Sequence, residues 1–178
     1  MNILVLTGSY RKKGNSNVLA ENFIKGAESA GHNVVRIDTA EKNILECRVC
    51  NTCFSRGPAC TFNDDFCEIA EEVIKADVVV LATPLYWFTM SAKLKLAIDK
   101  FYAFCVAGKK ISGKKAVLLA CGEGSDEDFA GLKVTYKQII DYLRWENRGM
   151  ILVSGVGRVG AIKGHPLLEN AEQLGKNL

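Results

Sequence analysis

The sequence has little that would place the protein in a membrane, on nucleic acid or outside the cell. No apolar stretch among its 178 residues approaches the length of a bilayer span. The first eight residues contain no basic leader and only a short apolar run, so we do not expect a signal peptide. The net charge of +3 is spread along the chain and predicts neither a nucleic-acid partner nor an anionic membrane. We therefore expect a cytoplasmic protein.

The chain also lacks the residues of a hydrolytic triad and the signs of disorder. Its two histidines are His32, in a turn, and His165, near the tail, and neither completes a Ser-His-Asp set. Apolar residues make up 48% and charged residues 24%, which is an ordinary globular balance. No linker, internal repeat or low-complexity segment is present. A single domain over residues 1–178 is the simplest expectation.

Cysteine, in contrast, is abundant. An odd total of seven, without a secretion signal, argues against a disulfide framework. Cys67, Cys105 and Cys121 are scattered, and we expect them to be buried as small hydrophobic residues. The other four fall close together and need a metal, a redox role or a purely structural explanation: Cys47, Cys50, Cys53 and Cys60.

Short apolar runs alternate with segments of helical periodicity. The strands are expected at Asn2 to Thr7, Val34 to Ile37, Asp77 to Thr83, Lys114 to Cys121 and Met150 to Ser154. The helices are expected at Ser16 to Gly31, Asp65 to Ala76, Ser91 to Cys105, Glu127 to Glu146 and Pro166 to Lys176. We take Gly31 as a helix stop and Asp65 with Glu68 as a capping box.

This alternation predicts an α/β fold, a doubly wound five-stranded parallel sheet with helices on both faces. Ligands of such sheets bind beyond the carboxyl ends of the strands. The loops that begin at Gly8, Pro84 and Gly122 should therefore form the site.

The first of these loops has the composition of a phosphate cradle. Glycine, serine and asparagine lead from a strand into a helix N-terminus, where free backbone N–H groups favour an anion. Ser9, Ser16 and the asparagine side chains can donate hydrogen bonds, and Arg11 adds charge. The spacing between Gly8 and Gly14 lacks the lysine of a nucleoside-triphosphate loop, so a single terminal phosphate fits better. Simple helix capping is the alternative reading.

Two further segments are open to more than one interpretation. Tyr86, Trp87 and Phe88 follow the third strand and can either shield a flat aromatic ligand or pack on a helix or a second subunit. The stretch from Gly155 to Gly160 has the G-x-G-x-x-G form, but too little chain follows for a dinucleotide fold. We interpret it as a flexible terminal loop.

Taken together, the first two loops resemble those of the NADPH-dependent FMN reductases of the flavodoxin-like superfamily. The resemblance rests on G-S-x-R-x-x-G-N-S-N from Gly8 and on P-L-Y-W-F-x-M-S-x-x-L-K-x-x-I-D from Pro84. It departs from the family at Tyr10, where proline is usual. It implies that phosphate is held by Ser9, Arg11, Asn15, Ser16 and Asn17. It implies that the flavin is lined by Pro84, Leu85, Tyr86, Trp87 and Phe88, and less securely by Gly122 and Glu123.

The cysteine run lies in a loop of about residues 44–62 and resembles that of the iron–sulfur flavoproteins, a branch of the same superfamily. That resemblance implies a [4Fe–4S] cluster ligated by Cys47, Cys50, Cys53 and Cys60, which takes electrons from ferredoxin and passes them to the FMN of a neighbouring subunit. The short spacing of the first three cysteines also favours iron–sulfur over zinc. Free thiols, a labile zinc ion or a partial disulfide are the alternatives.

The leading hypothesis is an FMN-dependent oxidoreductase or electron-transfer flavoprotein that carries a [4Fe–4S] cluster. The alternative is an NAD(P)H-dependent FMN or quinone reductase without a cluster, and a third is a non-enzymatic electron carrier. The flavin itself performs the chemistry, so no protein group is expected to be catalytic. The expected partners are a second copy of the chain, as a homodimer or homotetramer, ferredoxin or NAD(P)H as donor, and a small-molecule acceptor.

Overall fold

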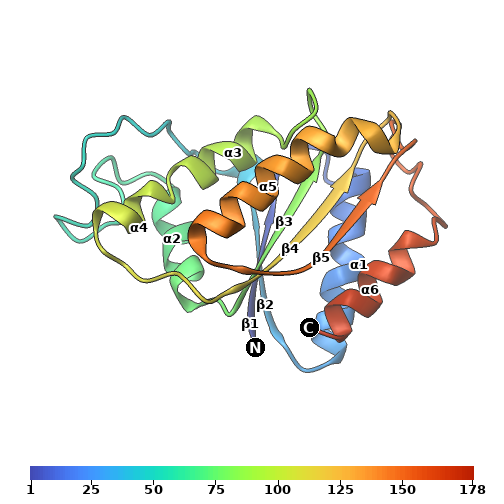
Figure 1. Ribbon diagram of the computed structural model, residues 1–178, viewed down its shortest axis with the longest axis horizontal. Coiled ribbons are helices and arrows are strands. Elements are labelled where there is room, and N and C mark those ends of the chain that lie inside the picture. The colour runs from blue at the N-terminus through green and yellow to red at the C-terminus, as the bar shows by residue number, and fades with distance from the viewer.

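A computed structural model describes residues 1–178 as a parallel sheet covered by helices on both faces (Figure 1). The strands are β1 (Asn2–Thr7), β2 (Asn33–Asp38), β3 (Val78–Pro84), β4 (Lys115–Cys121) and β5 (Glu146–Val153). The α-helices are α1 (Asn15–Ser29), α2 (Phe66–Lys75), α3 (Ala92–Asp99), α4 (Tyr102–Val106), α5 (Ala130–Leu143) and α6 (Leu167–Lys176). Two short 3₁₀ turns lie at Thr39–Glu41 and Asp126–Phe129.

The sheet has the order β2-β1-β3-β4-β5, and every neighbouring pair is parallel. This is the flavodoxin-like strand order, and it confirms the predicted fold class. The order reverses direction between β1 and β3, which is where a ligand crevice is expected. The loops that follow β1, β3 and β4 therefore open at the same edge of the sheet.

The two faces of the sheet bury separate apolar cores. One face packs against α1 and α6, through residues such as Leu19, Phe23 and Ala171. The other packs against α2, α3, α4 and α5, through residues such as Ile69 and Leu94. Strands buried on both faces are nearly continuous runs of Val, Leu and Ile, which explains why the sequence predicted them so readily.

The expected helix from Ser91 to Cys105 is interrupted. α3 ends at Asp99 and α4 begins at Tyr102, and at the break between them Lys100 pairs with the buried carboxylate of Asp64. The apolar stripe loses its phase at this break, so Cys105 is exposed rather than buried as predicted. Cys67 is half-buried and Cys121 is buried.

Of three other helix ends, two differ from the prediction and one confirms it. Asp65 does not cap α2, because its carboxylate accepts a hydrogen bond from the Asn43 N–H at 2.6 Å instead. α5 ends at Leu143 and not at Glu146, because Arg144 adopts a left-handed conformation with φ of 56° and turns the chain into β5. Gly31, with φ of 79°, follows the end of α1 as predicted.

None of the helices combines the length and apolar character needed to span a bilayer.

Candidate functional site

A pocket lies where the loops after β1, β3 and β4 meet, as the sequence predicted. It is lined by Ser9, Arg11, Gly14, Asn15, Ser16, Pro84, Leu85, Tyr86, Cys121, Gly122, Glu123, Val156, Gly157 and Val159. Backbone hydrogen bonds join these loops: Leu85 N–H donates to the Cys121 carbonyl at 2.7 Å, and Val156 N–H donates to the Gly122 carbonyl at 2.8 Å. Main-chain hydrogen bonds thus hold part of the pocket together.

The first loop ends in a helix N-terminus that no side chain caps. Gly14 occupies the N-cap position of α1, and the N–H groups of Asn15 and Ser16 have no acceptor within the chain. Ser16 is a buried residue whose hydroxyl forms no hydrogen bond within the chain, and the Arg11 guanidinium forms no ion pair. A Cβ at Gly14 would lie 2.8 Å from the Arg11 carbonyl oxygen, so the loop needs glycine there. Free donors, a helix dipole and one cation suit a phosphate group.

Asn15 takes part in this cradle differently from what the sequence suggested. Its side-chain amide donates to the carbonyls of Val156 and Arg158, both at 2.8 Å. Its side-chain oxygen accepts from the N–H groups of Gly160 and Ile162 at 3.1 and 3.4 Å. The Asn15 side chain therefore uses both of its N–H donors and both acceptor positions of its oxygen on the terminal loop. Only the backbone N–H of Asn15 remains to bind an anion.

Asn17 also supports the loop and does not line the pocket. Its amide donates to the carbonyls of Arg11 and Lys12 at 3.0 and 3.4 Å. Its buried side-chain oxygen has no hydrogen-bond partner. An acceptor oxygen cannot bind an unprotonated phosphate oxygen, so Asn17 shapes the cradle through its amide alone.

The segment from Gly155 to Gly160, interpreted from the sequence as a flexible terminal loop, is instead an ordered wall of the pocket. Asn15 fixes it, and Val156, Gly157 and Val159 line the cavity. A Cβ at Gly157 would lie 2.7 Å from the Glu123 carboxyl carbon, so glycine there allows the two loops to approach each other. The G-x-G-x-x-G spacing was visible in the sequence, but nothing local indicated that Asn15 would hold it.

The second loop forms a tight turn that carries three aromatic side chains outward. Tyr86 and Thr89 exchange backbone hydrogen bonds at 2.9 and 3.1 Å, and between them Trp87 and Phe88 adopt φ values of 46° and 64°. The N–H groups of these two residues donate to nothing in the chain. Trp87 is 92% exposed.

The flavin-lining residues predicted from the sequence divide between two adjoining hollows. Pro84, Leu85 and Tyr86 line the pocket, together with Gly122 and Glu123. Trp87 and Phe88 lie outside it. They border a shallow hollow that shares three residues with the pocket and is lined by Leu85, Tyr86, Trp87, Phe88, Glu123, Gly124 and Asp128. The two hollows form one trough, polar and cationic at the α1 end and aromatic at the other.

The residues of the trough fit FMN. The uncapped start of α1 and the unpaired Arg11 suit the phosphate, whereas the aromatic turn and the glycines of the third loop suit a flat ring. Cys121 also borders the pocket, and burial raises the pKa of its thiol to about 12, so that the thiol is neutral at physiological pH. No thiolate therefore competes with an anionic ligand.

A second, smaller pocket contains the whole cysteine cluster. It is lined by Glu46, Cys47, Arg48, Val49, Cys50, Asn51, Cys53, Cys60, Phe62, Lys100, Tyr102 and Ala103. Thus one irregular loop brings all four predicted ligands to one cavity, although they are not drawn together closely enough to form a metal-ligating group. All seven cysteines are free thiols.

The thiols of this cavity influence one another. Burial, followed by the neighbouring thiols of Cys50, Cys60 and Cys47, raises the pKa of Cys53. Hydrogen bonding to Thr52, whose hydroxyl lies 3.2 Å from the sulfur, lowers the pKa of Cys50. Because Val49, Asn51 and Phe54 have positive φ, the backbone turns sharply between successive cysteines. Sulfur donors on such a loop suit a thiolate-ligated metal.

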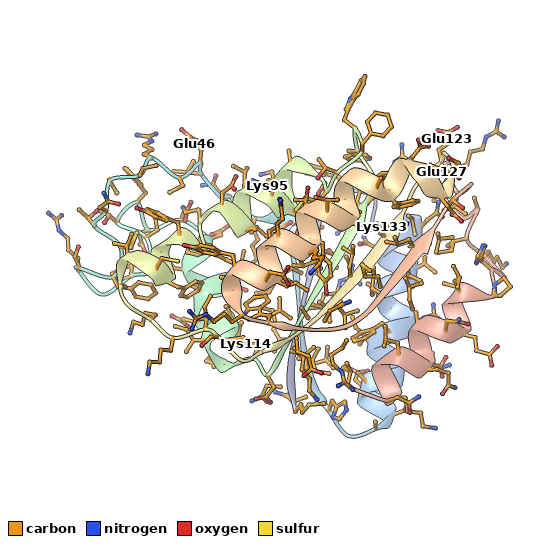
Figure 2. The ribbon with its side chains drawn as sticks, in the orientation of Figure 1. Glu46, Lys95, Lys114, Glu123, Glu127 and Lys133 are labelled. Atoms are coloured by element: carbon orange, nitrogen blue, oxygen red, sulfur yellow. The ribbon has the colours of Figure 1, made fainter.

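The cysteine loop and the trough lie far apart in one chain. In Figure 2, Glu46 at the start of the cysteine loop lies in the left half of the molecule and Glu123 of the third loop lies in the right half. The two pockets share no lining residue. A groove between α3, α4 and α5 adjoins the cysteine pocket through Tyr102.

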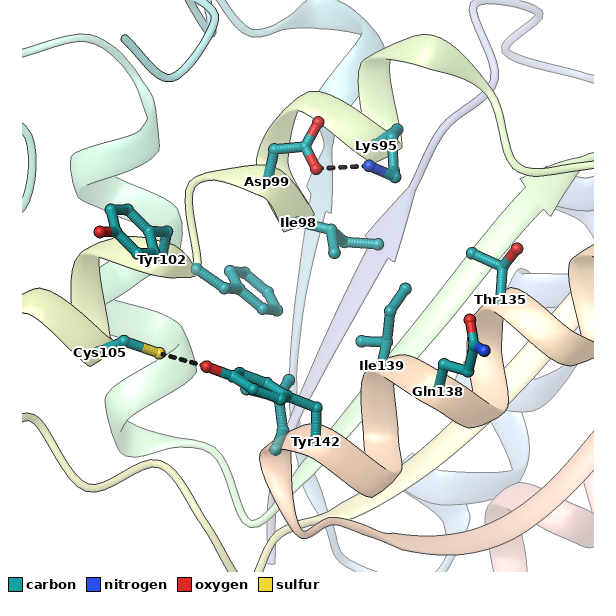
Figure 3. A pocket seen from close by; sticks show the side chains of 11 residues that line it. Lys95, Ile98, Asp99, Tyr102, Cys105, Thr135, Gln138, Ile139 and Tyr142 are labelled. Atoms are coloured by element: carbon teal, nitrogen blue, oxygen red, sulfur yellow. Dashed lines mark hydrogen bonds and ion pairs between the residues drawn. The ribbon is translucent and has the colours of Figure 1, made fainter. Parts of the chain in front are cut away.

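This groove is lined mostly by apolar side chains. In Figure 3, Cys105 of α4 points toward Tyr142 of α5, and the Cys105 sulfur lies 3.9 Å from the Tyr142 hydroxyl. Tyr142 is 76% exposed. The groove has no cationic cradle and no uncapped helix start, so we do not regard it as the cofactor site.

Comparison with known proteins agrees with this geometry. Residues 1–155 match the family model for NADPH-dependent FMN reductase. An iron-sulfur flavoprotein of Archaeoglobus fulgidus is 30% identical over 135 residues, which are 74% of this chain and 60% of that protein. The chain thus spans less than two thirds of this relative.

Two further comparisons cover nearly the whole chain. A Bacillus subtilis protein named as a putative NAD(P)H-dependent FMN-containing oxidoreductase is 27% identical over 98% of this chain and 96% of its own length. The solved structure of an NAD(P)H:quinone oxidoreductase from Methanothermobacter marburgensis superposes with a TM-score of 0.79 at 23% identity, over 99% of this chain and 95% of that one. At that identity the structure supports the fold alone.

Proposed function

The chain belongs to the NADPH-dependent FMN reductase family, a family of flavin-dependent oxidoreductases, and from this premise we propose that it holds FMN in the trough and a [4Fe–4S] cluster in the cysteine loop. The observation that carries the proposal is the pairing of an uncapped α1 N-terminus with a single cavity lined by four cysteines.

We assign the FMN phosphate to the start of α1. The backbone N–H groups of Asn15 and Ser16, the Ser16 hydroxyl and Arg11 donate to it, while Ser9 shapes the loop by accepting the Arg11 N–H at 3.2 Å. Asn15 and Asn17 fix the surrounding loops through their side chains. FMN supplies hydride acceptance and one-electron transfer when it is bound.

The aromatic turn and the third loop would hold the flavin ring. The free N–H groups of Trp87 and Phe88 are placed to donate to a ring edge that gains negative charge on reduction. Leu85 and Gly122 pack against each other below, since a Cβ at Gly122 would lie 3.1 Å from the Leu85 side chain. These contacts exclude water from one face and leave the opposite side open to a donor or acceptor.

The cluster would be ligated by Cys47, Cys50, Cys53 and Cys60 and would supply single-electron storage. The test compares chains purified without oxygen. Cys53→Ser should lose iron and sulfide while retaining FMN, whereas Cys105→Ser, which changes an exposed thiol outside the cavity, should retain both. Equal iron content in the two variants would refute the assigned ligands.

The distance between the cavity and the trough bears on assembly. Because the two sites lie in different halves of the chain and share no lining residue, we propose that electrons would pass to the FMN of a second copy in a homodimer or homotetramer. The exposed tyrosines Tyr102 and Tyr142 favour the α3–α4–α5 groove as part of that contact. A monomer in sedimentation at working concentration would overturn this.

Ferredoxin or NAD(P)H would be the donor and a small molecule the acceptor. The second candidate function is an NAD(P)H-dependent FMN or quinone reductase without a cluster. It is favoured by the observation that the four cysteines do not form a ligating group as they stand, and by the likeness to the B. subtilis protein. Rapid bleaching of the bound flavin by NADPH in iron-free protein would support it.

A further inference from the structure

Lys100, in the break between α3 and α4, is a buried cation. The residue is 3% exposed, and its ammonium lies 2.5 Å from a carboxylate oxygen of Asp64, whose side chain is 1% exposed. Removing such a pair from water is costly and contributes little net stability. Its position therefore calls for an explanation beyond the stability of the fold.

The two partners differ in how well they are satisfied. The Asp64 carboxylate accepts three hydrogen bonds: from Lys100, from the Leu45 N–H at 2.7 Å and from the Phe66 N–H at 3.2 Å. It thereby fastens both ends of the cysteine loop. The Lys100 ammonium has three N–H donors but makes one hydrogen bond, to Asp64. Donors remain unused in a side chain that water barely reaches.

Lys100 lines the same cavity as the four cysteines. The other charged residues of that cavity are Glu46 and Arg48, which pair with each other at 3.6 Å and are more than half exposed. Solvent screens those two, whereas a charge inside the protein acts through a lower effective dielectric. Lys100 is thus the one buried positive charge beside the sulfur atoms.

We propose that Lys100 sets the reduction potential of the metal–thiolate group held by the cysteine loop. The inference rests on the proposed function. A thiolate-ligated cluster is anionic and gains one further negative charge when it accepts an electron, and nearby charge and hydrogen bonds to sulfur tune its potential. A fixed cation beside it favours the reduced state, and Asp64 moderates that effect.

The test uses anaerobically purified full-length protein with FMN bound and follows the cluster by redox titration with EPR detection. Lys100→Gln should shift the reduction equilibrium at least tenfold toward the oxidised state, which is a midpoint lower by about 59 mV for one electron. Asp64→Asn leaves the cation uncompensated and should shift it at least tenfold the other way. The double variant should return to within threefold of the wild type.

Lys95→Gln is the matched control, because Lys95 lies on α3 and pairs with Asp99 at the surface. It should change the equilibrium less than twofold. General damage to the loop would move both single variants in the same direction, so opposite signs are the signature of a charge effect. FMN content reports folding in every variant. If Lys100→Gln does not accumulate, the sign of the Asp64→Asn shift decides.

Wild-type protein without iron would overturn the cluster and this inference together. A wild-type cluster whose potential responds to Lys100→Gln no more than to Lys95→Gln would overturn the inference alone.

Discussion

Replacing Asn15 by alanine should both destabilise the protein and weaken flavin binding. The side chain makes four hydrogen bonds to the 155–163 segment, two of them fully buried: to the Val156 carbonyl and from the Ile162 N–H. Each buried group left unpaired costs about 1–3 kcal/mol, and water replaces the other two bonds at little cost. We expect a loss of about 2–6 kcal/mol in the free energy of unfolding.

Two assays separate the consequences. Urea unfolding of flavin-free protein measures stability, and quenching of FMN fluorescence measures affinity. Because the released segment carries Val156 and Gly157 out of the pocket wall, affinity should fall by roughly tenfold to a hundredfold, or about 1.4–2.8 kcal/mol.

Asn22→Ala is the control, because Asn22 lies on the same helix and its amide makes one bond, to the Val18 carbonyl at 2.8 Å. It should cost no more than about 1 kcal/mol and leave FMN affinity unchanged. If Asn15→Ala behaves like Asn22→Ala in both assays, Asn15 does not hold the segment. If stability falls while affinity stays constant, the segment is not a wall of the flavin site.

Three further predictions concern other parts of the chain. Ser16→Asp should weaken FMN binding at least a hundredfold, as measured by the same quenching assay, because a carboxylate would occupy the uncapped start of α1 in place of the phosphate. Gly26→Ala should lower the urea midpoint, with a cost of about 1–3 kcal/mol, since its Cβ would lie 1.8 Å from the Glu172 carbonyl oxygen; an unchanged midpoint would contradict the close approach of α1 and α6. In metal-free protein near neutral pH, peptide mapping after iodoacetamide should find Cys50, whose pKa is lowered by Thr52, alkylated before Cys121, whose pKa burial raises to about 12; the reverse order would contradict the assignment.

The strand pattern and the phosphate loop could be predicted because their signals are local. Strands such as β3 are buried on both faces and are therefore apolar almost throughout. The loop from Gly8 to Asn17 leads from a strand into a helix, so its composition and its place in the fold can both be predicted from the sequence.

What the sequence did not reveal depends on contacts between distant segments. Asn15 holds Ile162 across 147 positions, and that contact turns an apparently flexible glycine segment into a pocket wall. Lys100 lies at the break between α3 and α4, and its partner, Asp64, lies 36 positions earlier in the chain. Neither pairing has a local signature, since asparagine and lysine are common at surfaces and helix ends.

The sequence also did not reveal that the aromatic side chains of the second loop border two different hollows. The motif correctly marked the segment where β3 ends and its loop begins, but the positive φ values of Trp87 and Phe88 turn these residues out of the pocket that Tyr86 borders. A positive φ is uncommon for bulky residues, so residue type does not predict it here.

The most direct test of the proposed cofactors is an assay of FMN, iron and acid-labile sulfide in protein purified without oxygen. We expect FMN in a one-to-one ratio with the chain and about four irons with matching sulfide, as a [4Fe–4S] cluster requires. FMN without iron would contradict the cluster and leave a nicotinamide-dependent flavin reductase whose cysteine loop has another role. Protein that binds no FMN at all would contradict the central assignment of the trough.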